Sequence, residues 1–252
     1  MREACRQAVA LGLPAVAFTE HVDHIRWGEG DRVAGAGLVL AYPAYTAPFD
    51  VPGYLECLER CRLEFPGLRV LAGVEAGEPH LFGASLAAVL AQGPFDRVLG
   101  SVHALAHEGA LVPVETLYPV LPADEVVRRY LREVVALLEG SDTVEVLAHL
   151  DYPRRYWPEE AGPYDEARYE PEYREVLRVL AATDRVLEVN TYSPMATVRL
   201  LRWWHEAGGR AVSFGSDAHV PDRVGELFRT AVDVVEASGF RPGRDPYDFW
   251  RR

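Results

Sequence analysis

The sequence lacks any long apolar run. No stretch of its 252 residues approaches the ~20 consecutive apolar residues that a membrane-spanning helix needs. The N-terminal segment MREACRQAVALG also lacks the apolar segment and the small-residue cleavage site of a secretory signal peptide. We therefore expect a soluble, cytoplasmic protein that does not bind a membrane.

Cysteine is scarce as well. The chain has three cysteines, Cys5, Cys57 and Cys61, an odd number that does not indicate a disulfide framework. Cys57 and Cys61 are spaced one turn apart on an expected helix, where cysteine commonly serves as a small buried apolar side chain. We expect that role for them, in a reducing compartment.

Basic residues are fewer than acidic ones. Lys and Arg number 26 against 38 Asp and Glu, which gives a formal net charge of −12 with acidic residues spread along the whole chain. Such a balance repels nucleic acids and anionic membranes, so we expect neither as a partner. A ligand that carries phosphate would need a local cationic site, and bound metal ions would supply one.

Linkers and low-complexity segments are also missing, so we expect one domain over residues 1–252. Hydrophobic residues make up 49% of the chain, enough for a full core, and its length is normal for an α/β barrel. Helical spacing of apolar residues predicts helices over 2–11, 124–140 and 171–182. Short runs rich in Val, Leu and Ala predict strands near 14–18, 69–75, 96–102, 144–149, 186–191 and 211–215. This alternation predicts a parallel α/β sheet or barrel.

Each predicted strand is followed by polar side chains that can bind metals. They occur in the segments Thr19-Glu20-His21, Gly73-Val74-Glu75, Gly100-Ser101-Val102-His103, His149-Leu150-Asp151, Glu188-Val189-Asn190 and Gly215-Ser216-Asp217-Ala218-His219. Because parallel strands bring their carboxyl ends to one rim, these side chains should converge. Histidine mixed with carboxylate, without cysteine, suits Zn²⁺, Mn²⁺ or Fe ions, and two such ions together can promote phosphoester hydrolysis. The pattern predicts metal-assisted hydrolysis.

The motifs resemble those of the polymerase and histidinol phosphatase (PHP) metallohydrolases, most closely the monofunctional histidinol-phosphate phosphatases. In chain order they are TEH at 19–21, GVEAG at 73–77, GSVHAL at 100–105, HLDYPRRY at 149–156, LEVNT at 187–191 and GSDAH at 215–219. The resemblance spans nearly the whole chain. It implies a distorted (β/α)₇ barrel, similar to a TIM barrel, and the hydrolysis of L-histidinol phosphate to L-histidinol and phosphate in histidine biosynthesis.

The resemblance also implies a set of site residues. Glu75 is similar to the carboxylate that bridges two ions, with His103 and His149 completing one of them. Asp217 resembles a ligand of the second ion, and His21 and His219 resemble ligands of the third. The residues that we assign to catalysis are Glu75, Asp217 and His21.

Substrate contacts are expected around the same rim. Arg154 and Arg155 follow His149 closely and are candidates to hold the phosphate dianion with a planar guanidinium group. The remaining candidate contacts are His24, Asp151 and Asn190, with an acidic residue such as Asp151 or Asp23 suited to the amine of the substrate.

One family motif is absent. The family begins with a strand ending in Asp-x-His-x-His, whereas this sequence contains no His-x-His and opens on a predicted helix. We therefore expect a barrel without its first strand, truncated at the N-terminus relative to the family. Either the true start lies upstream, in which case two to three ions would bind, or the protein is a degenerate member with one complete ion site, Glu75, His103 and His149. The open barrel edges would favour association, possibly as a homodimer.

Two other functions stay open. One is a phosphoesterase or nuclease of different specificity within the same family, against which the net charge of −12 and the absence of a basic stripe argue. The other is a non-catalytic metal-binding protein. The number of tightly bound ions distinguishes them, because a degenerate member should hold at most about one.

Overall fold

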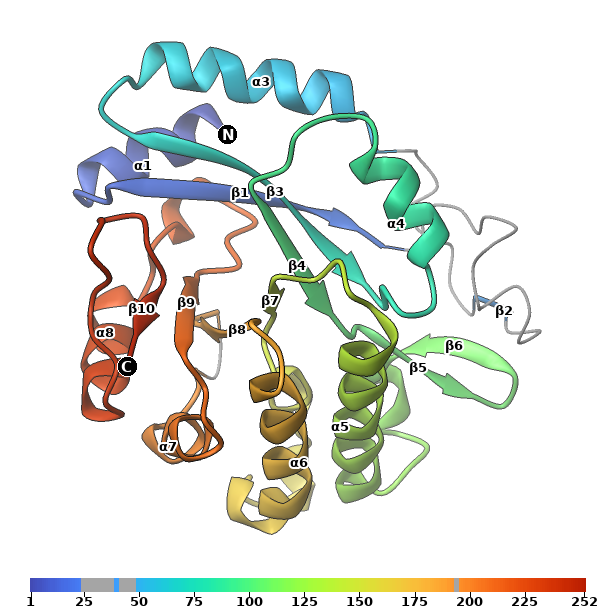
Figure 1. Ribbon diagram of the computed structural model, residues 1–252. Helices are drawn as coiled ribbons and strands as arrows, with labels where there is room; N and C mark the ends of the chain where they lie inside the picture. Colours follow the sequence, from blue (N-terminus) through green and yellow to red (C-terminus); the bar gives the residue numbers. More distant parts are fainter. Residues whose placement is uncertain (24–38, 41–48, 193–194) are drawn as a thin grey trace.

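The computed structural model describes residues 1–23, 39–40, 49–192 and 195–252 (Figure 1). Its main sheet has seven strands in the order β1-β3-β4-β7-β8-β9-β10. Their bounds are β1 Ala15–Val22, β3 Arg69–Gly77, β4 Arg97–Ser101, β7 Val146–Leu147, β8 Val186–Asn190, β9 Ala211–Gly215 and β10 Trp250–Arg251. His24 and most of the loop that we expected over residues 25–50 lie outside the described residues.

The first six strands of this order are parallel, as the alternation of strands and helices predicted. The sheet curls into a half-barrel, and β1 and β10 are its end strands in the described part of the chain (Figure 1). The α/β class and the parallel order are confirmed. That the barrel lacks its first strand stays a prediction.

Two details of the sheet differ from the sequence analysis. The predicted strand over 144–149 is paired only at Val146–Leu147, where it joins β4 and β8. The antiparallel strand β10 was missed, because it is a two-residue pairing of Trp250 and Arg251 with β9 and carries no alternating pattern.

Seven helices accompany the strands in the described part of the chain. Their bounds are α1 Arg2–Ala10, α3 Val51–Glu64, α4 Gly83–Leu90, α5 Ala123–Gly140, α6 Glu170–Ala181, α7 Val198–Glu206 and α8 Phe228–Ala237. α1, α5 and α6 confirm the three predicted helices. Asp50 caps α3 by accepting a hydrogen bond from the N–H of Gly53, and Thr197 caps α7 in the same way through Leu200. In Figure 1, α1 and α3 lie beside β1 and β3, while α5, α6 and α7 follow the later strands.

Short elements complete the chain. A small second sheet has the order β2-β6-β5, with β2 Val39–Leu40, β5 Ala104–His107 and β6 Ala110–Pro113. The 3₁₀ turns are η1 Val114–Leu117, η2 Tyr152–Tyr156, η3 Glu159–Ala161, η4 Glu166–Tyr169 and η5 Pro221–Arg223. β5 begins directly after His103 and so fixes the chain on the far side of a candidate ligand.

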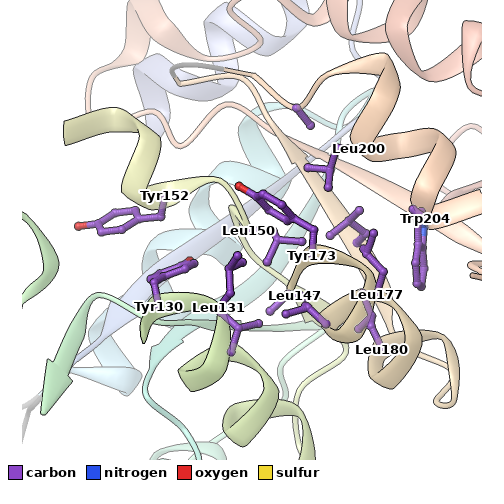
Figure 2. Close-up of a cluster of buried hydrophobic side chains, with 14 of the residues drawn as sticks. Tyr130, Leu131, Leu147, Leu150, Tyr152, Tyr173, Leu177, Leu180, Leu200 and Trp204 are labelled. Atoms are coloured by element: carbon purple, nitrogen blue, oxygen red, sulfur yellow. The ribbon is translucent and has the colours of Figure 1, made fainter. Parts of the chain in front are cut away.

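The two largest of the five buried clusters among the described residues support the sheet. The larger one packs α5, α6 and α7 against β7, β8 and β9, and Figure 2 shows part of it, including Tyr130, Leu131, Leu147, Tyr173, Leu177 and Trp204. The smaller one lies between α1, α3, β1 and β3 and contains Cys5, Leu58, Cys61 and Val70. Cys61 is therefore a buried apolar side chain as predicted, whereas Cys57, for which the same role was predicted, is only half-buried. Cys5 is buried as well. All three cysteines are free.

No helix in the described part of the chain is long and apolar enough to span a membrane.

Candidate functional site

The predicted site residues gather at the carboxyl ends of the parallel strands. His21 and Glu75 are directly paired positions on β1 and β3. His103 follows β4, His149 follows β7, and Asp217 and His219 follow β9. The strands β1, β3, β4, β7 and β9 thus each bring a side chain to one rim, as parallel pairing requires.

Glu75, His103 and His149 form the tightest group. Oε1 of Glu75 lies 2.7 Å from Nε2 of His149 and 3.2 Å from Nε2 of His103. The two Nε2 atoms are 3.2 Å apart. Glu75 and His149 are buried, and the His103 side chain is 14% exposed. Three lone-pair donors therefore point at one small volume.

A second group shares His103. Oδ2 of Asp23 lies 2.9 Å from Nδ1 of His21 and 3.3 Å from Nδ1 of His103, and Nδ1 of His21 lies 3.7 Å from Oε2 of Glu75. The sequence analysis considered Asp23 only for an acidic rim and missed it as a candidate ligand. The available signal was its place two residues after His21, where a strand-end pair of donors can share one ion.

Two glycines make room for these side chains. A Cβ at Gly77 would lie 2.1 Å from Oδ1 of Asp23 and 3.5 Å from Nδ1 of His103. A Cβ at Gly215 would lie 1.8 Å from Oε1 of Glu188. The glycines of the GVEAG and GSDAH segments are therefore needed for close approach.

The buried charges determine which groups are ionised. Burial alone would raise the pKa of Glu75, but His103 and His149 outweigh it and hold that pKa well below its usual value. Burial would likewise raise the pKa of Asp23, and contacts with His103 and His21 lower it instead. Both carboxylates stay ionised and supply negative charge to the pocket.

The histidines respond in the opposite direction. Burial would lower the pKa of His21, but its hydrogen bond to Asp23 and the charge of Glu75 raise that pKa to about 9. Burial would also lower the pKa of His103, and the same two carboxylates hold it well above its usual value. The pocket therefore attracts cations, whether protons or metal ions.

The donor set fits divalent metal ions. Within each of the two groups, the ligand atoms all lie within 4.8 Å of one another. Imidazole nitrogen and carboxylate oxygen are the donors that Zn²⁺, Mn²⁺ and Fe ions accept in proteins. His219 extends the set, because its Nε2 lies 3.4 Å from Nε2 of His21, although its side chain is 63% exposed.

Arg155 brings a cationic group to the rim, where it pairs with Asp217. The Arg155 guanidinium lies 2.7 Å from Oδ2 of Asp217 and donates a hydrogen bond of 3.0 Å to Oδ1 of Asn190. Its side chain is 11% exposed. Asp217 has a φ of 49°, in the left-handed region that non-glycine residues seldom occupy.

Arg154 is directed elsewhere. Its guanidinium carbon lies 5.5 Å above the ring of Tyr164, whereas Arg155 faces Tyr152 and Tyr192 at 5.2 and 4.8 Å. The structure therefore separates the two adjacent arginines and brings only Arg155 to Asp217 and Asn190. Tyr192, which the sequence analysis did not single out, also contacts the guanidinium of Arg223 at 4.8 Å.

Asp151 is buried near this region. Burial raises its pKa to about 6, against the lowering effect of Arg155. Its Oδ2 atom has no hydrogen-bond partner in the described part of the chain. Asp151 therefore interacts electrostatically with Arg155.

A cavity of about 450 Å³ opens at this rim. Its lining includes Glu75, His149, Asn190, Asp217 and His219, and it continues along β1 and β9. The volume suits a small ligand.

A family model for the PHP domain matches residues 1–192. The chain belongs to the PHP domain family. This PHP chain is also similar to a probable histidinol-phosphatase of Clostridium acetobutylicum, at 29% identity, with 90% of this chain and 83% of the relative covered. The histidinol-phosphatase of Lactococcus lactis subsp. lactis is 26% identical, with 95% of this chain and 85% of the relative covered.

Solved structures agree with the fold of this PHP chain. The crystal structure of the histidinol phosphate phosphatase of Lactococcus lactis, complexed with zinc, L-histidinol and phosphate, superposes with a TM-score of 0.79. It is 24% identical, and the match covers 95% of this chain and 88% of the other. A putative histidinol phosphatase of Listeria monocytogenes gives a TM-score of 0.72 at 18% identity, over 91% of this chain and 92% of the other.

Proposed function

We propose that this protein is a metal-dependent phosphatase that hydrolyses L-histidinol phosphate to L-histidinol and inorganic phosphate. The observation that carries the proposal is the convergence of histidines and carboxylates around the buried Glu75, beside the largely buried Arg155. The similar proteins named histidinol-phosphatase, which match nearly the full chain, supply the substrate. The zinc, L-histidinol and phosphate held by the Lactococcus lactis enzyme support the same assignment.

The metal ligands in this proposal are His21, Glu75, His103, His149, Asp217 and His219, to which we add Asp23 on its distances from His21 and His103. They would hold ions of zinc, manganese or iron, two to three of them if an Asp-x-His-x-His motif completes the site and about one if it does not. Bound ions of this kind polarise a phosphoryl oxygen and lower the pKa of water.

The residues of the chain divide the remaining work. Arg155 binds the phosphate dianion, because its planar guanidinium group is already oriented by Asp217 and Asn190. Glu75, Asp217 and His21 act in catalysis by keeping the reacting region charged and ordered. Asp151, Asn190 and His24 contact or surround the leaving group, with Asp151 facing its amine. Arg154, the second candidate for the phosphate, stacks on Tyr164 instead.

The domain organisation is part of the same proposal. Residues 1–252 form one PHP domain located in the cytoplasm, with a small phosphorylated substrate and no nucleic-acid partner. The absent Asp-x-His-x-His motif is the reason to expect that the sheet lacks the first strand of the family barrel.

The test is phosphate release from L-histidinol phosphate after the protein is stripped of metal and reloaded with Zn²⁺ or Mn²⁺. We expect release only in the reloaded protein, and faster for L-histidinol phosphate than for a simple phosphate monoester such as glycerol phosphate. Equal rates for both esters would contradict the substrate. No release from either ester by a protein that holds metal would contradict the phosphatase.

A further inference from the structure

Two buried glutamates lie behind the histidines that share Glu75. Glu78 is 0% exposed just after β3, and Glu188 is 7% exposed in β8. Neither belongs to the groups of candidate metal ligands found in the described part of the chain. A buried carboxyl group costs folding free energy unless its oxygens accept hydrogen bonds, so we asked what each one binds.

Glu78 binds the backbone at His103. Its Oε1 accepts hydrogen bonds from the N–H groups of His103, at 2.5 Å, and Ala104, at 2.8 Å. Its own N–H donates to the carbonyl of Ser101, at 2.9 Å. Glu78 has a φ of 45°, a strained conformation for a residue with a side chain. Such strain persists where surrounding contacts fix it. Here the hydrogen bonds of Glu78 with Ser101, His103 and Ala104 connect the end of β3 to the end of β4.

Glu188 does the same for His149. Its Oε2 accepts the N–H of His149, at 2.9 Å, and the side-chain amide of Asn190, at 3.1 Å. Asn190 in turn accepts a hydrogen bond from Arg155. Through Asn190, the carboxyl group of Glu188 therefore connects His149, a candidate metal ligand, to Arg155, the residue proposed to bind phosphate.

The hydrogen bonds between Glu78 and His103 and between Glu188 and His149 are made beyond the ends of β4 and β7, where the backbone is no longer paired as a strand. β4 ends at Ser101 and β7 ends at Leu147, so the N–H groups of His103 and His149 lie beyond the last paired residues of their strands. The glutamates bind these N–H groups and leave the Nε2 atoms of both rings free to face Glu75. Metal–ligand distances tolerate only ~0.2 Å, so a fixed backbone at these two positions matters for ion binding.

We propose that Glu78 and Glu188 are positioning residues, which hold His103 and His149 at metal-binding distance by accepting their backbone N–H groups. The inference rests on the metal centre proposed above, but not on the identity of the phosphoester. It requires an acceptor oxygen of the right reach at each position and does not require a negative charge there.

Two substitutions of Glu78 distinguish the effect of side-chain length from the effect of its negative charge. Glu78→Gln keeps the length of the side chain and one acceptor oxygen, whereas Glu78→Asp keeps the carboxylate and withdraws it by one methylene group. We expect Glu78→Asp to weaken Zn²⁺ binding by about 10–100-fold, the usual cost of losing a partner that orients a ligand, and Glu78→Gln to bind within a few-fold of the unchanged protein. The pair Glu188→Asp and Glu188→Gln should behave alike.

The matched control is Asp96→Ala. Asp96 accepts the N–H of Ala72 at 2.9 Å, a bond of the same kind between neighbouring strands, at the opposite end of β3 and β4. Its loss should leave Zn²⁺ affinity unchanged. Affinity is measured by competition with a chromogenic chelator, and the histidine ring signals of each metal-free variant are recorded by NMR.

The outcomes are distinct. Weak binding and a shifted His103 ring signal in Glu78→Asp, with both retained in Glu78→Gln, support the proposal. Weak binding in Glu78→Gln shows that charge is needed and overturns it, and so does unchanged binding in Glu78→Asp. Loss of the metal-free fold in both variants assigns Glu78 to folding and also overturns it.

These readouts do not depend on phosphate release. If the unchanged protein binds Zn²⁺ but does not hydrolyse L-histidinol phosphate, the substrate proposal fails while the affinities still decide the role of Glu78. If the unchanged protein binds no Zn²⁺, the metal centre fails and the NMR comparison of His103 decides alone.

Discussion

Glu75 is the residue on which the two donor groups depend, because its two oxygens face His103 and His149 on one side and His21 on the other. The substitution Glu75→Gln replaces one of those oxygens with an amide nitrogen that cannot bind a metal. We expect bound zinc and phosphate release to fall by more than the roughly 10–100-fold cost of removing an orienting partner. Zinc content after dialysis and the rate of phosphate release measure this effect. Full metal content with full activity would remove Glu75 from the centre.

The adjacent arginines provide a controlled pair at the same scale. Arg155→Lys keeps the charge but loses the planar group that meets Asp217 and Asn190. We expect KM for the phosphate monoester to rise by about 10–100-fold, the equivalent of one or two charge-assisted hydrogen bonds. Arg154→Lys, whose arginine stacks on Tyr164, should change KM little. A larger effect from Arg154→Lys than from Arg155→Lys would reverse the assignment.

The same pair shows what the sequence could predict about single residues. Strand-end positions predicted that His21, Glu75, His103, His149 and Asp217 converge, because parallel pairing leaves no other place for them. The sequence could not tell which arginine of Arg154-Arg155 faces the rim, since both lie in the 3₁₀ turn η2, where no simple alternation sets the direction of a side chain. Asp23 was missed for a similar reason, because it lies just beyond the end of β1.

At the scale of elements, α3 stabilises the two strands that carry His21 and Glu75. The Tyr54 hydroxyl donates to the carbonyl of Phe18 in β1, at 2.6 Å, and accepts the N–H of Gly73 in β3, at 2.8 Å. Tyr54→Phe leaves both backbone groups without this partner, in a region where Tyr54 is only 6% exposed. We expect the free energy of unfolding to fall by about 1–3 kcal/mol.

Thermal unfolding checks this expectation against a second tyrosine. For a chain of this size the loss corresponds to a melting temperature about 2–4 °C lower per kcal/mol. Tyr247→Phe is the control, because Tyr247 is 40% exposed and the ring alone stacks on Arg69. Equal melting temperatures for the unchanged protein and Tyr54→Phe would show that the hydroxyl is dispensable.

Long apolar elements were the easiest to predict. The stripe of α5 and the buried runs of β3, β8 and β9 have one pattern each, and the structure has them near the expected bounds. Short elements were harder to predict, since β7 was expected to be longer than its two residues and β10 was missed, and both strands are defined by their partners across the sheet. Pairing of that kind depends on tertiary contacts, which a local pattern does not contain.

At the scale of the whole molecule, the open sheet bears on association. β1 pairs with β3 along one edge, and among the described strands none pairs with its other edge. The cavity runs along β1, past Ala15 and Ala17, to Phe214 on β9. An unpaired edge of this length favours pairing with another chain, so we expect a homodimer or larger assembly in sedimentation experiments. A monodisperse monomer across a wide concentration range would contradict this expectation.

The raised pKa values of His21 and His103 predict how metal binding depends on pH. In the metal-free protein the pKa of His21 is raised to about 9, and that of His103 also lies well above its usual value, because Asp23 and Glu75 outweigh the effect of burial. Below those values a metal ion must displace protons from the rings, so its apparent affinity falls as pH falls.

We therefore expect Zn²⁺ affinity to rise between pH 6 and about 9, the pKa of His21, by roughly tenfold per pH unit for each proton displaced, and to level off above it. Competition with a chelator of known pH dependence measures the slope. The variant His107→Gln, which removes a histidine of β5 outside both donor groups, should keep the same slope. An affinity that does not change with pH would show that the histidines do not exchange protons for metal. It would then be the carboxylates, and not the imidazole rings, that bind the ion.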